Sequence, residues 1–174
     1  MTRKFMEVPI VHIIGLPGAG KTTLARRLSK KLKIPIYGIG YYRGRFPMTA
    51  IGEADAWLAL FRDLSTRGWK NCILETTGLN VRENFLSAAL PFDRMIVVKL
   101  EASRKILMER IGQKKKSERG GKWLYNQFED KYDFVKQMYP SFKKIQAHFV
   151  IKADRMTKEE IFCGVLKKLG SFIG

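Results

Sequence analysis

Short apolar runs alternate along the chain with stretches in which apolar residues recur at helical spacing. The runs that predict β-strands are 8–14, 34–39, 71–74, 94–100 and 147–152. The stretches that predict helices are 22–32, 53–66, 82–90, 103–111, 122–138 and 158–169. Strands that are apolar along nearly their whole length are typical of parallel sheets covered on both faces. The alternation therefore predicts an α/β fold, a three-layer sandwich with a five-stranded parallel sheet.

The length and composition favour one globular domain over residues 1–174. The 174 residues are 45% hydrophobic and 28% charged, which excludes disordered, collagen-like and coiled-coil chains. No apolar run approaches the roughly 20 residues of a membrane span, and the first residues do not resemble a secretory signal. The only two cysteines, Cys72 and Cys163, are expected to be reduced and buried. We therefore expect a cytoplasmic monomer with no membrane partner.

The charge is strongly positive and unevenly distributed. The chain has 33 Lys and Arg residues against 16 Asp and Glu residues, a net charge of +17. Residues 21–45 hold eight bases and no acid, and residues 102–122 hold eight bases against Glu109 and Glu118. Such a surface attracts polyanions and releases counterions when it meets phosphates. The charge predicts a polyanionic partner, without separating RNA, DNA and anionic membrane.

One segment fits a phosphate-binding motif. Residues 15–22, Gly-Leu-Pro-Gly-Ala-Gly-Lys-Thr, match G-x-x-x-x-G-K-[ST] between a predicted strand and a predicted helix. Glycines let the backbone curl so that successive amides converge on phosphate oxygens. Lys21 is expected to reach the β- and γ-phosphates, and Thr22 to offer its hydroxyl to Mg²⁺. The predicted nucleotide-binding residues here are Gly15, Pro17, Gly18, Ala19, Gly20, Lys21, Thr22 and Thr23.

Other proteins with such a loop fit the sequence less well. GTP switches add D-x-x-G and N-K-x-D, whereas this chain has Glu75-Thr-Thr-Gly78 and Ile151-Lys-Ala-Asp154. The first position of each motif differs, and the second motif needs its Asn side chain to bind the base. A motor or remodelling ATPase would usually need a longer chain. Neither class is favoured.

The order of the motifs resembles that of P-loop kinases of the nucleoside and nucleotide kinase type, over nearly the whole chain. Residues 40–43 follow the second strand, where such kinases place acceptor-site residues, and residues 73–80 resemble the family's acidic strand end and acceptor loop. The basic stretch 112–121 resembles the lid over the triphosphate. The resemblance implies ATP and Mg²⁺ as cofactors, with Asp154 and Arg155 near adenine.

Phosphoryl transfer depends mainly on positioning and charge neutralisation, which assigns roles to several side chains. Arg110 and Arg119 are candidates to contact the triphosphate from the lid side, and Arg43 to bind the acceptor. Glu75 and Thr22 are the predicted metal-site residues. The predicted catalytic residues are Lys21, Glu75, Asp55, Arg43 and Arg110.

The chain departs from the family at the expected general base. Tyr41 and Tyr42 occupy the stretch where the family usually has an Asp, and a tyrosine is a poor base at neutral pH. Glu75 could act as base or hold Mg²⁺ through water. Glu53 and Asp55 either act above the acceptor or complement the dipole of their helix. Trp57, at helical spacing with apolar residues, is expected in the core.

The net charge favours an acceptor on nucleic acid, with DNA preferred. Short segments, including Tyr37–Arg43, Glu53–Trp57 and Glu75–Asn80, resemble phage enzymes that phosphorylate 5-hydroxymethyluracil in DNA. That resemblance implies phosphorylation of a base hydroxymethyl group, with the nucleotide flipped out of the stack. Three alternatives stay open. They are a 5′-hydroxyl polynucleotide or RNA kinase, a small-molecule kinase, and a nucleic-acid-binding module whose nucleotide site is vestigial.

Overall fold

The computed structural model describes residues 8–79, 95–113 and 128–173. The strands are β1 (Ile10–Ile14), β2 (Ile36–Gly38), β3 (Ile73–Thr76), β4 (Met95–Glu101) and β5 (Phe149–Lys152). The helices are α1 (Lys21–Leu32), α2 (Ile39–Arg43), α3 (Ala50–Thr66), α5 (Arg104–Gly112), α7 (Lys131–Lys143) and α8 (Lys158–Ile173).

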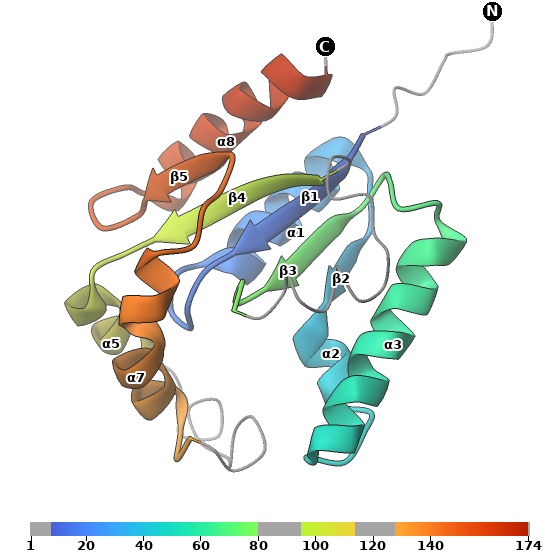
Figure 1. Ribbon diagram of the computed structural model, residues 1–174. Helices are drawn as coiled ribbons and strands as arrows, with labels where there is room; N and C mark the ends of the chain where they lie inside the picture. The colour runs from blue at the N-terminus through green and yellow to red at the C-terminus, as the bar shows by residue number, and fades with distance from the viewer. Residues whose placement is uncertain (1–7, 80–94, 114–127, 174) are drawn as a thin grey trace, which may run out of the picture.

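All five strands are parallel and form one sheet in the order β2-β3-β1-β4-β5 (Figure 1). The central strand β1 is buried along its whole length, as the apolar run predicts. Because the strands are parallel, their carboxyl ends meet at one edge, where ligands bind in such sheets. The predicted parallel α/β sandwich is confirmed.

Two apolar clusters cover the two faces of the sheet. One joins Val11 and Ile13 of β1 to Leu28 of α1 and Val165 of α8. The other joins the alternate β1 residues, Ile10 and Ile14, to side chains of α2 and α3. Successive strand residues point to opposite faces, so one strand supplies both clusters. Cys72 is buried in the second cluster, whereas Cys163 is exposed on α8, contrary to the expectation that both thiols are buried.

Several boundaries differ from the sequence prediction. The second strand was predicted to end at residue 39, but it ends at Gly38, because α2 already begins at the next residue. Helix α3 starts at Ala50, three residues before the predicted start, because the Thr49 side chain accepts a hydrogen bond from the Gly52 amide.

Helix α7 differs most from the prediction. The predicted helix 122–138 begins only at Lys131, where Asp130 caps the amides of Tyr132 and Asp133, and it continues through Pro140 to Lys143. Some predicted segments lie outside the described residues. They are residues 122–127 of that helix, the predicted helix 82–90 and most of the lid segment 112–121. Within the described ranges, no helix is long and apolar enough to cross a bilayer.

Candidate active site

The loop between β1 and α1 forms a cradle of backbone amides at the carboxyl edge of the sheet. Gly18 and Gly20 have φ values of 86° and 95°, which side-chain-bearing residues rarely adopt. Gly20 precedes α1 without any side-chain cap, so the first amides of the helix are left for another acceptor. A Cβ at Gly20 would meet no atom within 4 Å, so the space over the helix start is open. A phosphate oxygen is the acceptor that such a helix start favours.

Lys21 and Thr22 begin α1 and turn toward different partners. The Lys21 ammonium donates to the carbonyl oxygen of Leu16 at 3.3 Å, which folds the side chain back along the loop. The Thr22 hydroxyl donates to Oε1 of Glu75 at 2.7 Å. Thr23 is exposed, and its role in nucleotide binding stays a prediction.

The contact between Thr22 and Glu75 joins the two predicted metal-site residues. Because the hydroxyl proton points to the carboxylate, the oxygen lone pairs of Thr22 are left for a cation. In the described part of the chain, no group of three His, Cys, Asp or Glu side chains is placed to hold a metal. Mg²⁺ suits this arrangement, since it usually binds one or two protein oxygens together with substrate phosphates and water. The residues present therefore fit Mg²⁺, and Thr22 and Glu75 are the side chains that would hold it.

Arg110 extends from the last turn of α5 to the phosphate loop. Its guanidinium donates to the carbonyl oxygens of Gly18, at 3.5 Å, and Ala153, at 3.0 Å. The side chain thus connects the loop after β1 to the loop after β5. Asp154 accepts a hydrogen bond from the Ser103 amide at 2.7 Å, which lowers the pKa of its carboxyl. Asp154 thereby holds the start of α5 in place.

Three nucleotide-site candidates, Asp154, Arg155 and Arg119, remain predictions. Arg155 is exposed and makes no hydrogen bond or ion pair in the described part of the chain. Arg119 lies outside the described residues.

On the acceptor side, Arg43 is held in a fixed orientation. Its Nε and one terminal nitrogen donate to the two oxygens of Glu53 at 2.7 and 2.6 Å. The indole nitrogen of Trp57 donates to Glu53 at 2.8 Å, and the Trp57 ring is buried as predicted. Glu53 therefore anchors an arginine, a role that the sequence did not reveal. Asp55, on the same helix, forms no hydrogen bond or ion pair with this group, and its catalytic role stays a prediction.

The two tyrosines after β2 differ in their surroundings. Tyr41 is 70% exposed, whereas Tyr42 is 2% exposed and donates to the Asp63 carboxylate at 2.5 Å. Burial, together with the bond to Asp63, raises the pKa of the Tyr42 phenol well above its ordinary value. Tyr42 therefore stays protonated at neutral pH and is a structural donor, not a base.

A buried histidine supports the loop after β3. His12 lies in the middle of β1, 2.8 Å from the Thr76 hydroxyl, and burial lowers its pKa to about 3. The imidazole is therefore neutral at physiological pH. The same Thr76 oxygen accepts the Gly78 amide at 3.0 Å, which fixes the chain just after Glu75.

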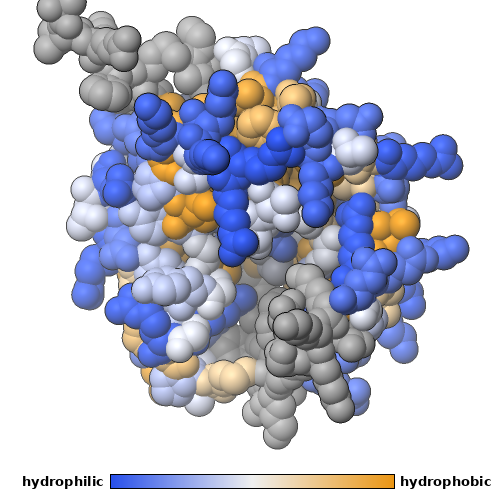
Figure 2. Space-filling model, turned by 180° about the vertical axis from the view of Figure 1, so that it is seen from behind, coloured by the Kyte–Doolittle hydropathy of each residue, from blue (hydrophilic) through white to orange (hydrophobic). Residues whose placement is uncertain are grey.

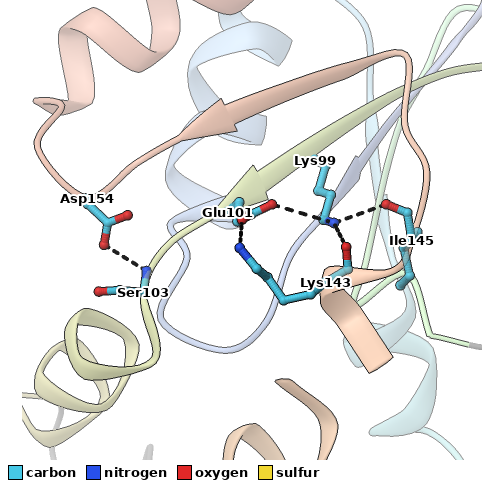
Figure 3. A network of polar contacts seen from close by, with 6 residues as sticks. All are labelled: Lys99, Glu101, Ser103, Lys143, Ile145 and Asp154. Carbon is cyan, nitrogen blue, oxygen red and sulfur yellow. Dashed lines mark hydrogen bonds and ion pairs between the residues drawn. The ribbon is translucent and has the colours of Figure 1, made fainter. Parts of the chain in front are cut away.

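A second polar network lies beside the site at the end of β4 (Figure 3). Lys99 is 2% exposed, and its ammonium donates to the carbonyl of Lys143, the last residue of α7, at 3.1 Å and to that of Ile145, two residues beyond the helix, at 3.0 Å. The Glu101 carboxylate lies 3.6 Å from the Lys99 ammonium and forms a closer ion pair with the Lys143 ammonium. Burial lowers the pKa of Lys99, and Glu101 partly offsets this effect. The network fixes the end of α7 to the carboxyl edge of the sheet.

Comparison with solved structures shows the same fold over nearly the whole chain. Shikimate kinase from Acinetobacter baumannii, in complex with shikimate, matches with a TM-score of 0.68 and 20% identity, covering 99% of this chain and 98% of that chain. A gluconokinase from Sinorhizobium meliloti 1021 matches with a TM-score of 0.65 and 15% identity, covering 98% and 95%. Thymidylate kinase from Candida albicans matches with a TM-score of 0.63 and 15% identity, covering 95% and 92%.

These neighbours show the fold of the chain, and they do not show the resemblance to phage 5-hydroxymethyluracil DNA kinases. None of the curated protein sequences compared with the chain matches it. A family model does match: residues 11–133 fit AAA_18, described as an AAA domain. That match spans the phosphate loop, Glu75 and Arg110, which the fold brings to one edge of the sheet. The chain therefore belongs to the AAA_18 family of AAA domains and has the fold of the P-loop kinases.

Proposed function

We propose that the protein is a kinase, formed by the whole chain as one domain, that transfers the γ-phosphate of ATP to a hydroxyl group of a small molecule. The contact of Thr22 with Glu75 at the phosphate loop is the main support for phosphoryl transfer. Arg43 supports an acceptor site on the same edge, because α2 follows β2 and Gly38 pairs in register with Glu75.

The side chains of the site have different roles in phosphoryl transfer. The loop amides and Lys21 bind the triphosphate, and Arg110 adds positive charge beside Gly18. Mg²⁺, when bound, neutralises charge on the phosphate oxygens. Glu75 orients the Thr22 hydroxyl, and its carboxylate is also placed to accept a proton from the acceptor. Arg43 has donors beyond those bound to Glu53, and these could fix an anionic or hydroxylated acceptor.

A small acceptor is favoured by the extent of the structural match. The matches to the shikimate kinase and the gluconokinase cover 99% and 98% of this chain. The architecture of those two kinases thus accounts for nearly the whole chain. A second candidate acceptor is a hydroxyl on nucleic acid, including the hydroxymethyl group of 5-hydroxymethyluracil in DNA. The net charge of +17 favours this second candidate.

The test is transfer of labelled γ-phosphate from ATP, with Mg²⁺, to a panel of acceptors assayed side by side. The panel contains hydroxy acids, sugars, nucleosides, nucleotides, RNA, unmodified DNA with a free 5′-hydroxyl, and DNA containing 5-hydroxymethyluracil. We expect label on a free small molecule and none with Lys21→Ala. Label only on polymers would support the second candidate, and ATP binding without transfer to any acceptor would refute the kinase proposal.

A further inference from the structure

The sheet edge opposite the phosphate loop gathers positive charge. Because β1 and β2 are parallel, α1 must return to the edge where the strands begin, and its end carries Lys30, Lys31 and Lys33. Helix α3 returns to the same edge, and the turn that follows it contains Arg67 and Lys70. The two chain segments meet there, since the Ile73 amide donates to the Pro35 carbonyl at 2.9 Å.

The three lysines at the end of α1 are available to an external anion. Lys30, Lys31 and Lys33 are exposed, and within the described ranges no carboxylate forms an ion pair with them. By contrast, Arg27 on the same helix is neutralised by Glu159 of α8. The α1 and α8 side of the molecule is mostly hydrophilic (Figure 2). The end of α1 therefore concentrates charge that the fold itself does not use in ion pairs.

The turn between α3 and β3 also lines a pocket at this edge. It has a volume of about 510 Å³ and is lined by Tyr37, Asp63, Thr66, Arg67, Lys70 and Asn71. The Arg67 guanidinium lies 5.8 Å from the Tyr37 ring centroid, and its Nε donates to the Tyr37 hydroxyl. The terminal nitrogens of Arg67 make no other hydrogen bond within the described part of the chain, so they can bind a phosphate. Asp63, the acid in the lining, accepts its hydrogen bond from Tyr42.

We propose that this edge, formed by the end of α1 and the turn between α3 and β3, binds the phosphodiester backbone of nucleic acid. Exposed lysines, together with a pocket that holds an aromatic ring and a guanidinium at the same edge, suit phosphates and an exposed base. An anionic membrane is a poorer fit. The exposed large apolar side chains of the described residues are Tyr41, Met48, Ile51, Leu58, Val150 and Phe172, and none lies on α1 or on this turn.

This surface is separate from the proposed acceptor site. The phosphate loop, Glu75 and Arg43 lie at the carboxyl edge, and the cationic surface lies where the strands begin. Nucleic acid bound here would therefore localise the protein without being its substrate. The inference accounts for positive charge that small-molecule phosphorylation does not need, and it holds whether or not the kinase proposal does.

The test is fluorescence anisotropy with labelled duplex DNA and labelled single-stranded RNA, titrated with the full chain between about 50 and 200 mM salt. The variant replaces Lys30, Lys31 and Lys33 by Gln. The matched control replaces Arg104, Lys105 and Lys136 by Gln, which removes equal charge from exposed positions on α5 and α7. We expect the α1 variant to lose about tenfold or more in affinity, with a salt slope lower by roughly 2–3, since each lost phosphate contact removes about 0.9. The control should lose less than about threefold.

A separate variant, Arg67→Gln, tests the pocket and should weaken binding by about threefold to tenfold. Thermal unfolding of every variant checks the fold, since surface substitutions of this kind usually change stability by less than about 0.5 kcal/mol. Equal losses in the α1 variant and the control would overturn the proposal, as would absence of binding by the wild type. Binding to phosphatidylserine vesicles but not to nucleic acid would overturn it in favour of a membrane. Phosphate transfer to a small acceptor, measured in parallel, should be unchanged in the α1 variant.

Discussion

Gly18 combines an unusual backbone conformation with a close neighbour. Its φ is 86°, and a Cβ placed on it would lie 2.8 Å from the Leu107 carbonyl oxygen, a backbone atom of α5. Gly20 has a similar φ of 95° but open space around its Cβ position. The pair separates two costs of a side chain in the loop, the strain of a positive φ and a clash with the backbone of another helix.

We predict that Gly18→Ala destabilises the protein more than Gly20→Ala does. A positive φ alone costs about 1–2 kcal/mol, and the clash in Gly18→Ala should add about 1–3 kcal/mol. The measurement is the free energy of unfolding from urea denaturation, with the two variants compared directly. Equal losses would show that α5 moves aside without cost.

The hydroxyl of Thr22 gives a second prediction at this scale. Thr22→Ala should lower kcat by about 10²–10³, because the loss of one preorganised group at a charged transition state commonly has this effect. Thr22→Ser keeps the hydroxyl and should retain most activity. Both variants are assayed over a range of Mg²⁺ concentrations, and equal activity of the two would exclude a role for the Thr22 oxygen.

At the scale of elements, α7 is held by a lysine from the sheet. Lys99 donates to the carbonyl of Lys143, a group that the helix end leaves without an intrahelical donor, and to the carbonyl of Ile145 just beyond the helix. At the other end, Asp130 caps two amides. Polar groups from outside the helical turns therefore satisfy both ends of α7.

Replacement of Lys99 by Met should destabilise the protein by about 2–4 kcal/mol. Met has a similar length and is apolar, but it leaves two carbonyls without their donor and removes one of the two cations beside Glu101. Asp130→Ala, which removes only a cap, should cost about 1 kcal/mol. Urea denaturation measures both values, and a Lys99→Met variant as stable as wild type would show that the ammonium contributes nothing net.

The sequence predicted the elements of the catalytic edge well, because their signals are local. A buried strand, a glycine-rich loop and Lys21 followed by Thr22 lie within fifteen residues of one another along the chain. Glu75 was expected near Thr22 because it ends a parallel strand, and the carboxyl ends of such strands share the edge that holds the loop. Glu53 was harder, because its role depends on Arg43 from a separate short helix. Tyr42 with Asp63, and Lys99 with the end of α7, join residues that no local pattern connects.

At the scale of the whole molecule, stability should depend on acid pH through Glu101. Burial by itself raises the pKa of this carboxyl, but the hydrogen bond from Lys143 and the charges of Lys143 and Lys99 lower it below its usual 4.5. A lowered folded-state pKa contributes stability that is present above about pH 4.5 and is lost as the pH falls through the folded-state value.

Glu101→Gln should therefore be less stable than wild type at pH 7, by about 1–3 kcal/mol, and the difference should shrink toward pH 3. Urea denaturation at a series of pH values measures both proteins. A difference that stays constant over this range would mean that the Glu101 charge does not contribute.

The burial of Cys72 has a practical consequence. Its thiol lies in the core with a pKa raised to about 12 by burial, whereas Cys163 is exposed on α8. A thiol-specific dye should thus attach at Cys163 first, giving a singly labelled protein without mutagenesis. The rate of the slower modification of Cys72 would then report how often the core opens spontaneously. A bound nucleotide or nucleic acid should lower that rate.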